Sequence, residues 1–156
     1  MIQGGDISLS SNASSSSLPF LIPKGGASIF HPGPLEQEIH LPTLRHNSRG
    51  ILSMASKAVK KPTVGGGVET QEVNGSQFFV TFAPAPHLDG KSTVFGKVLG
   101  MVSGEAEGED TLTKLERAAV KVDRKGRVVH GCEGEEEPWQ TIGVEKVTVH
   151  ANPFAG

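Results

Sequence analysis

Runs of strand-forming residues dominate the hydrophobic pattern of the first two thirds of the chain. Ser76–Phe82 is rich in aromatic and branched side chains, which favour a strand, and the two prolines of residues 83–86 end it. Thr93–Val98 predicts a second strand, and the short apolar run Gly50–Ala55 suits a buried one. Met1–Asp6 is typical of a strand end that runs into a glycine turn.

One helix is predicted in the last third of the chain. Asp110 or Thr111 can cap its first turn. Leu112, Leu115 and Ala119 then fall on one face at helical spacing.

Other segments carry turn, loop or strand signals. Residues 8–17 are mostly serine, which predicts a flexible loop because so little apolar surface offsets the cost of ordering it. A glycine triplet inside Lys57–Val73 predicts a long loop, and the Asn-Gly pair that follows it is a common turn. Residues 123–138 predict a surface loop, and the valines of residues 144–149 a final strand.

Composition supports a single, largely β domain. The 156 residues include 20 glycines and 10 prolines, and 36% are hydrophobic, which favours turns and short strands over a helical bundle. The net charge of -2 gives no reason to expect binding to nucleic acid or an anionic membrane. The sequence shows no membrane span and no signal peptide.

Few residues suggest covalent or metal chemistry. The six histidines lack tight ligand spacing, so we expect no metal site and no cofactor. Ser53 and Ser76 lack a nucleophile motif. Cys132 is the single cysteine, which excludes an internal disulfide, and its acidic neighbours disfavour a reactive thiolate. His46 beside Asn47 is expected to hold a turn.

Alternation along Ser76–Phe82 places unlike side chains together. Gln77, Phe79 and Thr81 share one face of the predicted strand. A polar group beside an aromatic ring suits a small-ligand site. A plain core strand explains the same pattern equally well.

Five spaced blocks resemble the cyclophilins, a family of peptidyl-prolyl cis-trans isomerases. The blocks are Met1–Asp6, Gly25–Phe30, Gly50–Ala55, Asn74–Thr81, and His87–Lys91 followed by Val94–Val98. Three further blocks are similar to the isomerase-like 3 subfamily: Leu44–Asn47, Pro86–Asp89 and His150–Ala155.

The resemblance implies an antiparallel β-barrel with a capping helix. Residues 1–156 would form one cyclophilin-like domain, with inserted loops near 8–24 and 57–73. This domain would lack the family's first two strands, its first helix and its catalytic arginine, which precedes the position of Met1. Arg45 and Arg49 do not fit the motif of that arginine.

The resemblance also implies a site for proline. Gln3 would be catalytic, contacting the substrate backbone and orienting the arginine. Met1, Phe79 and Leu88 would line the proline pocket, and Gln77 would lie beside the same groove.

Four more substrate contacts follow from the resemblance. Ala55 and Ser56 would meet the residue before proline, although the family usually has asparagine where Ser56 stands. His87 replaces a tryptophan of cyclosporin-sensitive members, so weak cyclosporin binding is expected. Ser92 would leave the pocket edge open.

Three hypotheses follow for the function. The first is an isomerase, or rotamase, that acts on proline-containing proteins in protein folding, as a chaperone, or in complex remodelling. It would work in the nucleus and cytoplasm, with spliceosomal proteins as partners and with activity below that of a complete member. The second is a non-catalytic module that binds proline-containing peptides. The third is an incomplete gene product.

Overall fold

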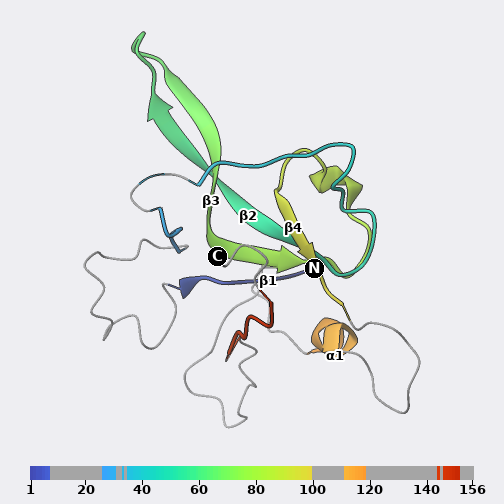
Figure 1. The fold of residues 1–156 in the computed structure, drawn as a ribbon. Coiled ribbons are helices and arrows are strands. Elements are labelled where there is room, and N and C mark those ends of the chain that lie inside the picture. Colours follow the sequence, from blue (N-terminus) through green and yellow to red (C-terminus); the bar gives the residue numbers. More distant parts are fainter. Residues whose placement is uncertain are drawn as a thin grey trace, which may run out of the picture. The chain divides into compact units, whose positions relative to one another are not determined.

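The computed structural model describes residues 1–7, 26–30, 33, 35–99, 111–118, 144 and 146–151. Four strands form an antiparallel sheet in the order β1-β3-β2-β4 (Figure 1). The elements are β1 Ile2–Gly4, β2 Ile51–Pro62, β3 Val68–Val80, the 3-10 helix η2 Pro86–Leu88, β4 Val94–Lys97 and α1 Thr111–Arg117. The predicted mostly-β fold with a helix is confirmed.

The β2–β3 hairpin is the longest feature, and we call its far part, residues 57–73, the hairpin arm. Strand pairs run without a break from Lys57 opposite Val73 to Pro62 opposite Val68. β1 and β4 pair only with the near part of the hairpin, so the hairpin arm extends beyond them (Figure 1). The loop predicted for residues 57–73 is therefore wrong, because a continuous backbone ladder orders this segment.

A tight turn closes the hairpin arm. The Thr63 amide donates to the Gly67 carbonyl over 2.9 Å, and the Gly66 amide donates to the Thr63 carbonyl over 3.0 Å. Gly66 has a φ of 80°, a left-handed conformation that glycine adopts without steric cost. The glycine triplet thus marks the tip of a hairpin and not an unstructured segment.

Asn74-Gly75 lies inside β3, so the turn predicted there is also wrong. The Asn74 amide donates to the Leu35 carbonyl over 2.9 Å, and Ser56 pairs with Asn74 across the sheet. A bulge between Met54 and Ser56 shifts the register of the β2–β3 pairing in this region. The hydrogen bond to Leu35 and the pairing with Ser56 therefore hold Asn74-Gly75 in an extended conformation.

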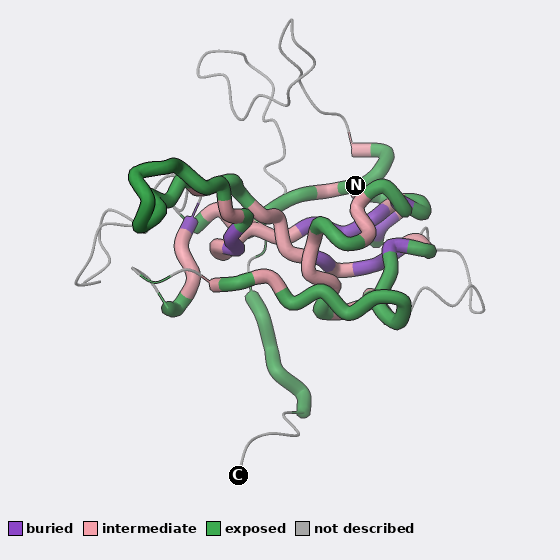
Figure 2. The backbone as a smooth tube through the Cα atoms, turned by 90° about the horizontal axis from the view of Figure 1, so that it is seen from above, coloured by how far each residue is buried: buried purple, intermediate pink, exposed green. Residues whose placement is uncertain are grey.

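The core of the described residues is small, and the buried segments lie in the interior of the tube in Figure 2. Its buried apolar residues are Ile51, Val73, Phe79, Val80, Ala85 and Leu112. Thr81, directly after β3, is 1% exposed. Its hydroxyl accepts a hydrogen bond from the Ile51 amide and donates to the Ser48 carbonyl, each over 2.9 Å. This side chain joins the end of β3 to the start of β2.

Arg49 holds α1, the helix that buries Leu112. Its Nη1 donates to the Phe82 carbonyl over 2.9 Å and also bonds the Glu116 carboxylate. Nη2 donates to the Thr113 hydroxyl over 3.1 Å. The guanidinium also lies 5.6 Å from the centroid of the Phe82 ring. Because one planar group bonds two side chains of α1, it fixes the helix against the end of β3.

The chain divides into two compact units, Met1–Arg117 and Ala118–Gly156. In the second unit the strand predicted at residues 144–149 is wrong for the described residues, which form no strand there. Val144, Val147 and Val149 are 67%, 76% and 74% exposed. The assignment of one domain to the whole chain stays a prediction.

Some predictions fall outside the described residues. They are the loops at residues 8–24 and 123–138, the helix position Ala119, and Cys132. Among the residues that are described, no helix is long and apolar enough to cross a membrane.

Candidate functional site

β1 and β3 bring together two glutamines and an aromatic ring of the predicted site. Gln3 lies opposite Phe79 in the strand register. Its Nε2 donates to Gln77 Oε1 over 2.7 Å, and Gln77 Nε2 donates to Asp6 Oδ2 over 3.0 Å. Phe79 is 4% exposed, whereas Met1, just before β1, is 56% exposed. These two hydrogen bonds hold Gln77 next to Gln3, the residue that lies opposite Phe79.

β2 contributes Ala55 and Ser56 at its bulge. The irregularity lies between Met54 and Ser56, and both predicted site residues are half-buried. A bulge bends its strand and redirects the side chains next to it. This pair therefore lies where the regular part of the sheet passes into the hairpin arm.

η2 carries His87 and Leu88, and the turn after it carries Ser92. His87 is exposed, while Leu88 and Ser92 are half-buried. The Leu88 amide donates to the Ala85 carbonyl over 3.0 Å. The Leu88 carbonyl then accepts hydrogen bonds from the Lys91 and Ser92 amides over 3.0 and 3.3 Å. These bonds wind the segment tightly around Leu88.

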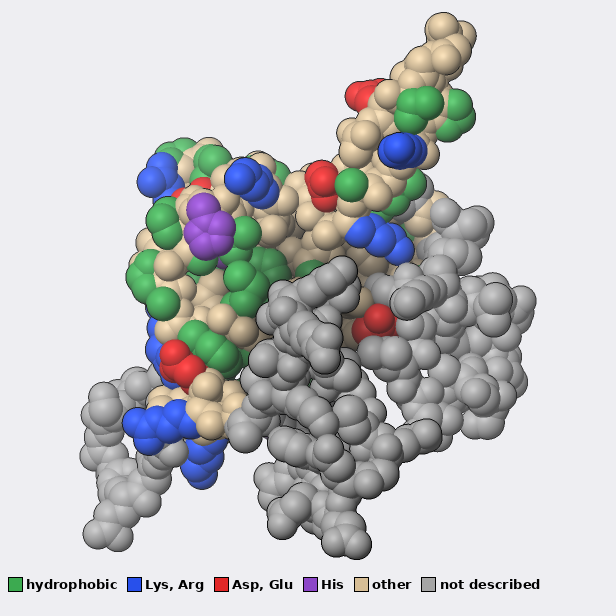
Figure 3. Space-filling view, turned by 180° about the vertical axis from the view of Figure 1, so that it is seen from behind, with side chains coloured by type: hydrophobic (Ala, Val, Ile, Leu, Met, Phe, Trp, Pro, Cys, Tyr) green, Lys and Arg blue, Asp and Glu red, His purple; other side chains and the backbone are tan. Residues whose placement is uncertain are grey.

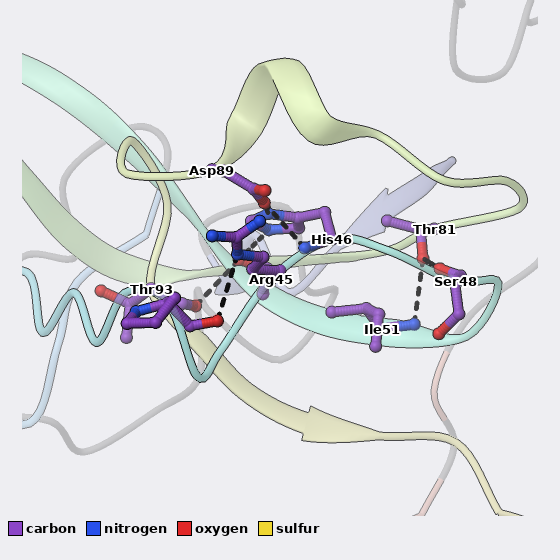
Figure 4. Close-up of polar contacts among 9 residues, drawn as sticks. Arg45, His46, Ser48, Ile51, Thr81, Asp89 and Thr93 are labelled. Carbon is purple, nitrogen blue, oxygen red and sulfur yellow. Dashed lines mark hydrogen bonds and ion pairs between the residues drawn. The ribbon is translucent and has the colours of Figure 1, made fainter.

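A buried polar network lies between η2 and the sheet (Figure 4). Asp89 Oδ1 accepts from the His46 amide over 2.8 Å and lies 2.9 Å from His46 Nδ1. His46 Nε2 lies 3.0 Å from Ser53 Oγ, and this hydroxyl donates to the Thr93 carbonyl over 2.8 Å. His46 is 1% exposed and Ser53 0%. The imidazole thus has a polar partner at each nitrogen.

The network is structural and not nucleophilic. An Asp-His-Ser order is the arrangement that activates a serine in hydrolases. Here Ser53 is fully buried, so no substrate carbonyl can reach its hydroxyl. The His46 amide, and secondly its ring, hold the pKa of Asp89 below its usual value. Within the described part of the chain, no group of His, Cys, Asp or Glu is placed to hold a metal ion.

The sequence did not reveal this network. His46 was expected only to hold a turn, and Asp89 lies 43 positions further along the chain. No local pattern shows that two such residues meet. The one available signal was that both belong to blocks of the family resemblance.

Comparison with known proteins decides the family. The family model "Cyclophilin type peptidyl-prolyl cis-trans isomerase/CLD" matches residues 1–149. This chain belongs to the cyclophilin-type peptidyl-prolyl cis-trans isomerases. The predicted family and enzyme class are thereby confirmed.

The cyclophilin has similar relatives in two fungi. A "Peptidyl-prolyl cis-trans isomerase-like 3" of Emericella nidulans is 60% identical over 162 residues. One of the same name in Aspergillus fumigatus is 61% identical over 163 residues. Each alignment covers 99% of this chain and 76% of the relative.

Solved structures of a Cryptosporidium parvum cyclophilin type peptidyl-prolyl cis-trans isomerase are also similar. One is 37% identical with a TM-score of 0.46 and covers 68% of this chain and 53% of that chain. A second, determined in the presence of the dipeptide Ala-Pro, has a TM-score of 0.45. This chain therefore spans about half the length of those solved chains.

Proposed function

We propose that this cyclophilin accelerates rotation about X-Pro peptide bonds at the surface formed by β1, the β2 bulge, β3 and η2. The observation that carries the proposal is the family match over residues 1–149. The Gln3–Gln77 hydrogen bond supports it, because it fixes a polar pair next to Phe79.

The reaction needs positioning and no nucleophile. The X-Pro bond resists rotation because resonance gives it partial double-bond character, with a barrier of about 20 kcal/mol. A surface that binds the twisted amide more tightly than either planar isomer lowers this barrier. In our proposal Met1, Phe79 and Leu88 contact the proline ring, while Gln3 and Gln77 bind the flanking backbone.

The residues around the proline ring determine which ligands fit the proposed site. Ala55 and Ser56 would meet the residue before proline, and the small Ser92 would leave one edge open. His87 offers a smaller apolar surface than an indole, which supports the proposal of weak cyclosporin binding. Proline-containing peptides are therefore the proposed ligands.

The cellular role is also a proposal. We propose a chaperone-like part in folding or remodelling protein complexes of the nucleus and cytoplasm, with spliceosomal proteins as partners. The resemblance to the isomerase-like 3 subfamily supports this role. Co-purification of spliceosomal proteins with the tagged chain from nuclear extract tests it, and recovery from cytosol alone would count against it.

Exchange NMR tests the isomerase directly. Uncatalysed X-Pro rotation takes roughly tens to hundreds of seconds, so a peptide with one Ala-Pro bond alone shows no cis-trans cross-peaks at sub-second mixing times. Addition of the protein in catalytic amounts is expected to produce them. Gln3→Ala should weaken the cross-peaks, and Lys60→Ala, on the exposed hairpin arm, should leave them unchanged.

The same spectra separate the alternatives. Peptide shifts without exchange cross-peaks would identify a binding module that does not catalyse. If neither shifts nor cross-peaks appear with the folded protein, the proposed function is wrong.

A further inference from the structure

His46 contacts both ends of η2. Its carbonyl accepts a hydrogen bond from the Ala85 amide over 2.8 Å, at the residue just before η2. Its amide and Nδ1 both reach Asp89 Oδ1, at the residue just after η2. The proposed substrate contacts His87 and Leu88 lie between these two anchors. One residue therefore fixes the position of the whole segment.

The ring of His46 also contacts the sheet. It stacks on Phe79 with ring centroids 5.9 Å apart and an interplanar angle of 19°. Its Nε2 contacts Ser53, and Ser53 pairs with Phe79 across β2 and β3. The Ser53 hydroxyl continues to the Thr93 carbonyl, next to Ser92. The imidazole thus bridges β3, β2, η2 and the turn before β4.

We infer that His46 is a positioning residue for the proline site, which sets the separation between Phe79 and η2. The inference rests on the proposed function. His46 is 1% exposed and does not meet the substrate, so its effect passes through Phe79 and Leu88. An imidazole suits this role because it is rigid, stacks by its face and bonds by both nitrogens. Loss of either polar partner leaves the stack but frees the ring to tilt.

Two conservative substitutions test the role while retaining the stack. Ser53→Ala removes the partner of Nε2, and Asp89→Asn keeps the acceptor oxygen but removes the charge. For Ser53→Ala we expect about a tenfold weaker affinity for the Ala-Pro peptide, because Phe79 and Leu88 would no longer be held at the separation that fits the proline ring. The exchange rate at saturating peptide should fall much less, since the lost contact acts on ground and transition states alike.

A second readout reports the network without any ligand. In the free protein, Ser53→Ala should shift the Phe79 ring resonances, because Phe79 stacks on the His46 ring. It should also shift the Leu88 methyl resonances, because His46 anchors both ends of η2. His40→Asn is the matched control, because His40 is an exposed histidine in the same segment. It should change neither the spectrum nor the affinity.

The outcomes separate this inference from the proposed function. If the wild-type protein neither binds nor isomerises the peptide, the proposed function fails. If it does, and Ser53→Ala and Asp89→Asn fold with wild-type affinity and unshifted Leu88 and Phe79 resonances, His46 has no positioning role. His46→Asn is the direct variant, and should it not fold, the other two substitutions decide.

Discussion

Among the residues that the structure describes, the three largest fully buried side chains, those of His46, Ser53 and Thr81, are all polar. Each is satisfied by hydrogen bonds to backbone or side-chain partners at distant positions. A buried polar group stabilises a fold only while its partners are present, because losing one leaves a desolvated donor or acceptor. At the scale of single residues, this small core therefore depends on complete hydrogen bonding as well as on apolar packing.

Thr81→Val tests that dependence. The substitution keeps the shape of the side chain but leaves the buried Ile51 amide without the hydroxyl that it bonds. We expect the free energy of unfolding to fall by about 1–3 kcal/mol, measured by urea denaturation. Thr70→Val, at an exposed position of the hairpin arm, is the control and should change little. Equal stability of both variants would contradict the role assigned to the Thr81 hydroxyl.

The electrostatic environment of Asp89 predicts that part of the stability of the fold is lost in acid. Its pKa is lowered in the folded state, first by the His46 amide and then by the His46 ring. A lowered folded pKa means that the ionised carboxylate stabilises the fold above the ordinary aspartate pKa, about 4, and that this contribution is lost as the pH falls below it. In thermal unfolding at several pH values, Asp89→Asn should remove this part of the acid sensitivity. A parallel pH dependence of wild type and variant would rule it out.

At the scale of elements, the hairpin arm is the part least linked to the core. Nearly all its residues are exposed outside its base, where Val73 is buried (Figure 3). Its strands are held by the backbone ladder and by the turn at Gly66. Local opening of such an exposed element is expected to cost less free energy than opening the sheet.

Gly66→Ala tests the turn of the hairpin arm. Gly66 has a φ of 80° with open space around it, so alanine meets no clash but takes a left-handed conformation that costs about 1–2 kcal/mol. We expect faster amide hydrogen exchange in the hairpin arm and an unchanged global unfolding midpoint. Gly65→Ala also points into open space and has no positive φ, so it should leave exchange unchanged. A similar acceleration in both variants would show that the glycine conformation is not what closes the turn.

The sequence predicts strands correctly where a buried face leaves a hydrophobic pattern. The prediction is wrong where pairing with other segments of the chain decides the structure. All four strands were recognised at least in part, because Ile51, Phe79 and their neighbours are strand-forming residues and Met1–Asp6 is typical of a strand end. The hairpin arm has almost no buried face, so it left no periodicity to find. The valines of residues 144–149 favour a strand, but propensity does not supply a partner. The site glutamines were proposed from the family resemblance, whereas the His46 network joins residues too distant for any local signal.

At the scale of the whole molecule, the hairpin arm adds little to the described core. The lysines Lys57, Lys60 and Lys61 lie on its β2 side. Charged lysines on an exposed strand disfavour pairing with the strands of other chains. Of the buried apolar residues that the structure describes, Val73 alone belongs to the hairpin arm, and it lies at the base of the arm.

Excision of the hairpin arm tests this independence. Ala58 and Glu72 are paired across the strands, so an Asn-Gly turn can join them after removal of residues 59–71. We expect the shortened protein to keep its thermal midpoint and its affinity for the Ala-Pro peptide, measured by circular dichroism and NMR titration. Loss of cooperative unfolding would show that the hairpin arm supports the sheet. Weaker peptide binding by a folded product would instead place the arm in the groove.

The burial of Asn74 has a consequence for how the protein ages. An Asn-Gly pair deamidates when the glycine nitrogen attacks the preceding side-chain carbonyl and closes a succinimide ring. In β3 the Asn74 side chain is 4% exposed, its Nδ2 donates to the Glu36 carbonyl over 3.2 Å, and its backbone amide is held by Leu35. The ring can close only after this part of β3 has opened. The rate at which isoaspartate accumulates at position 74 during storage therefore measures how often this part of β3 opens.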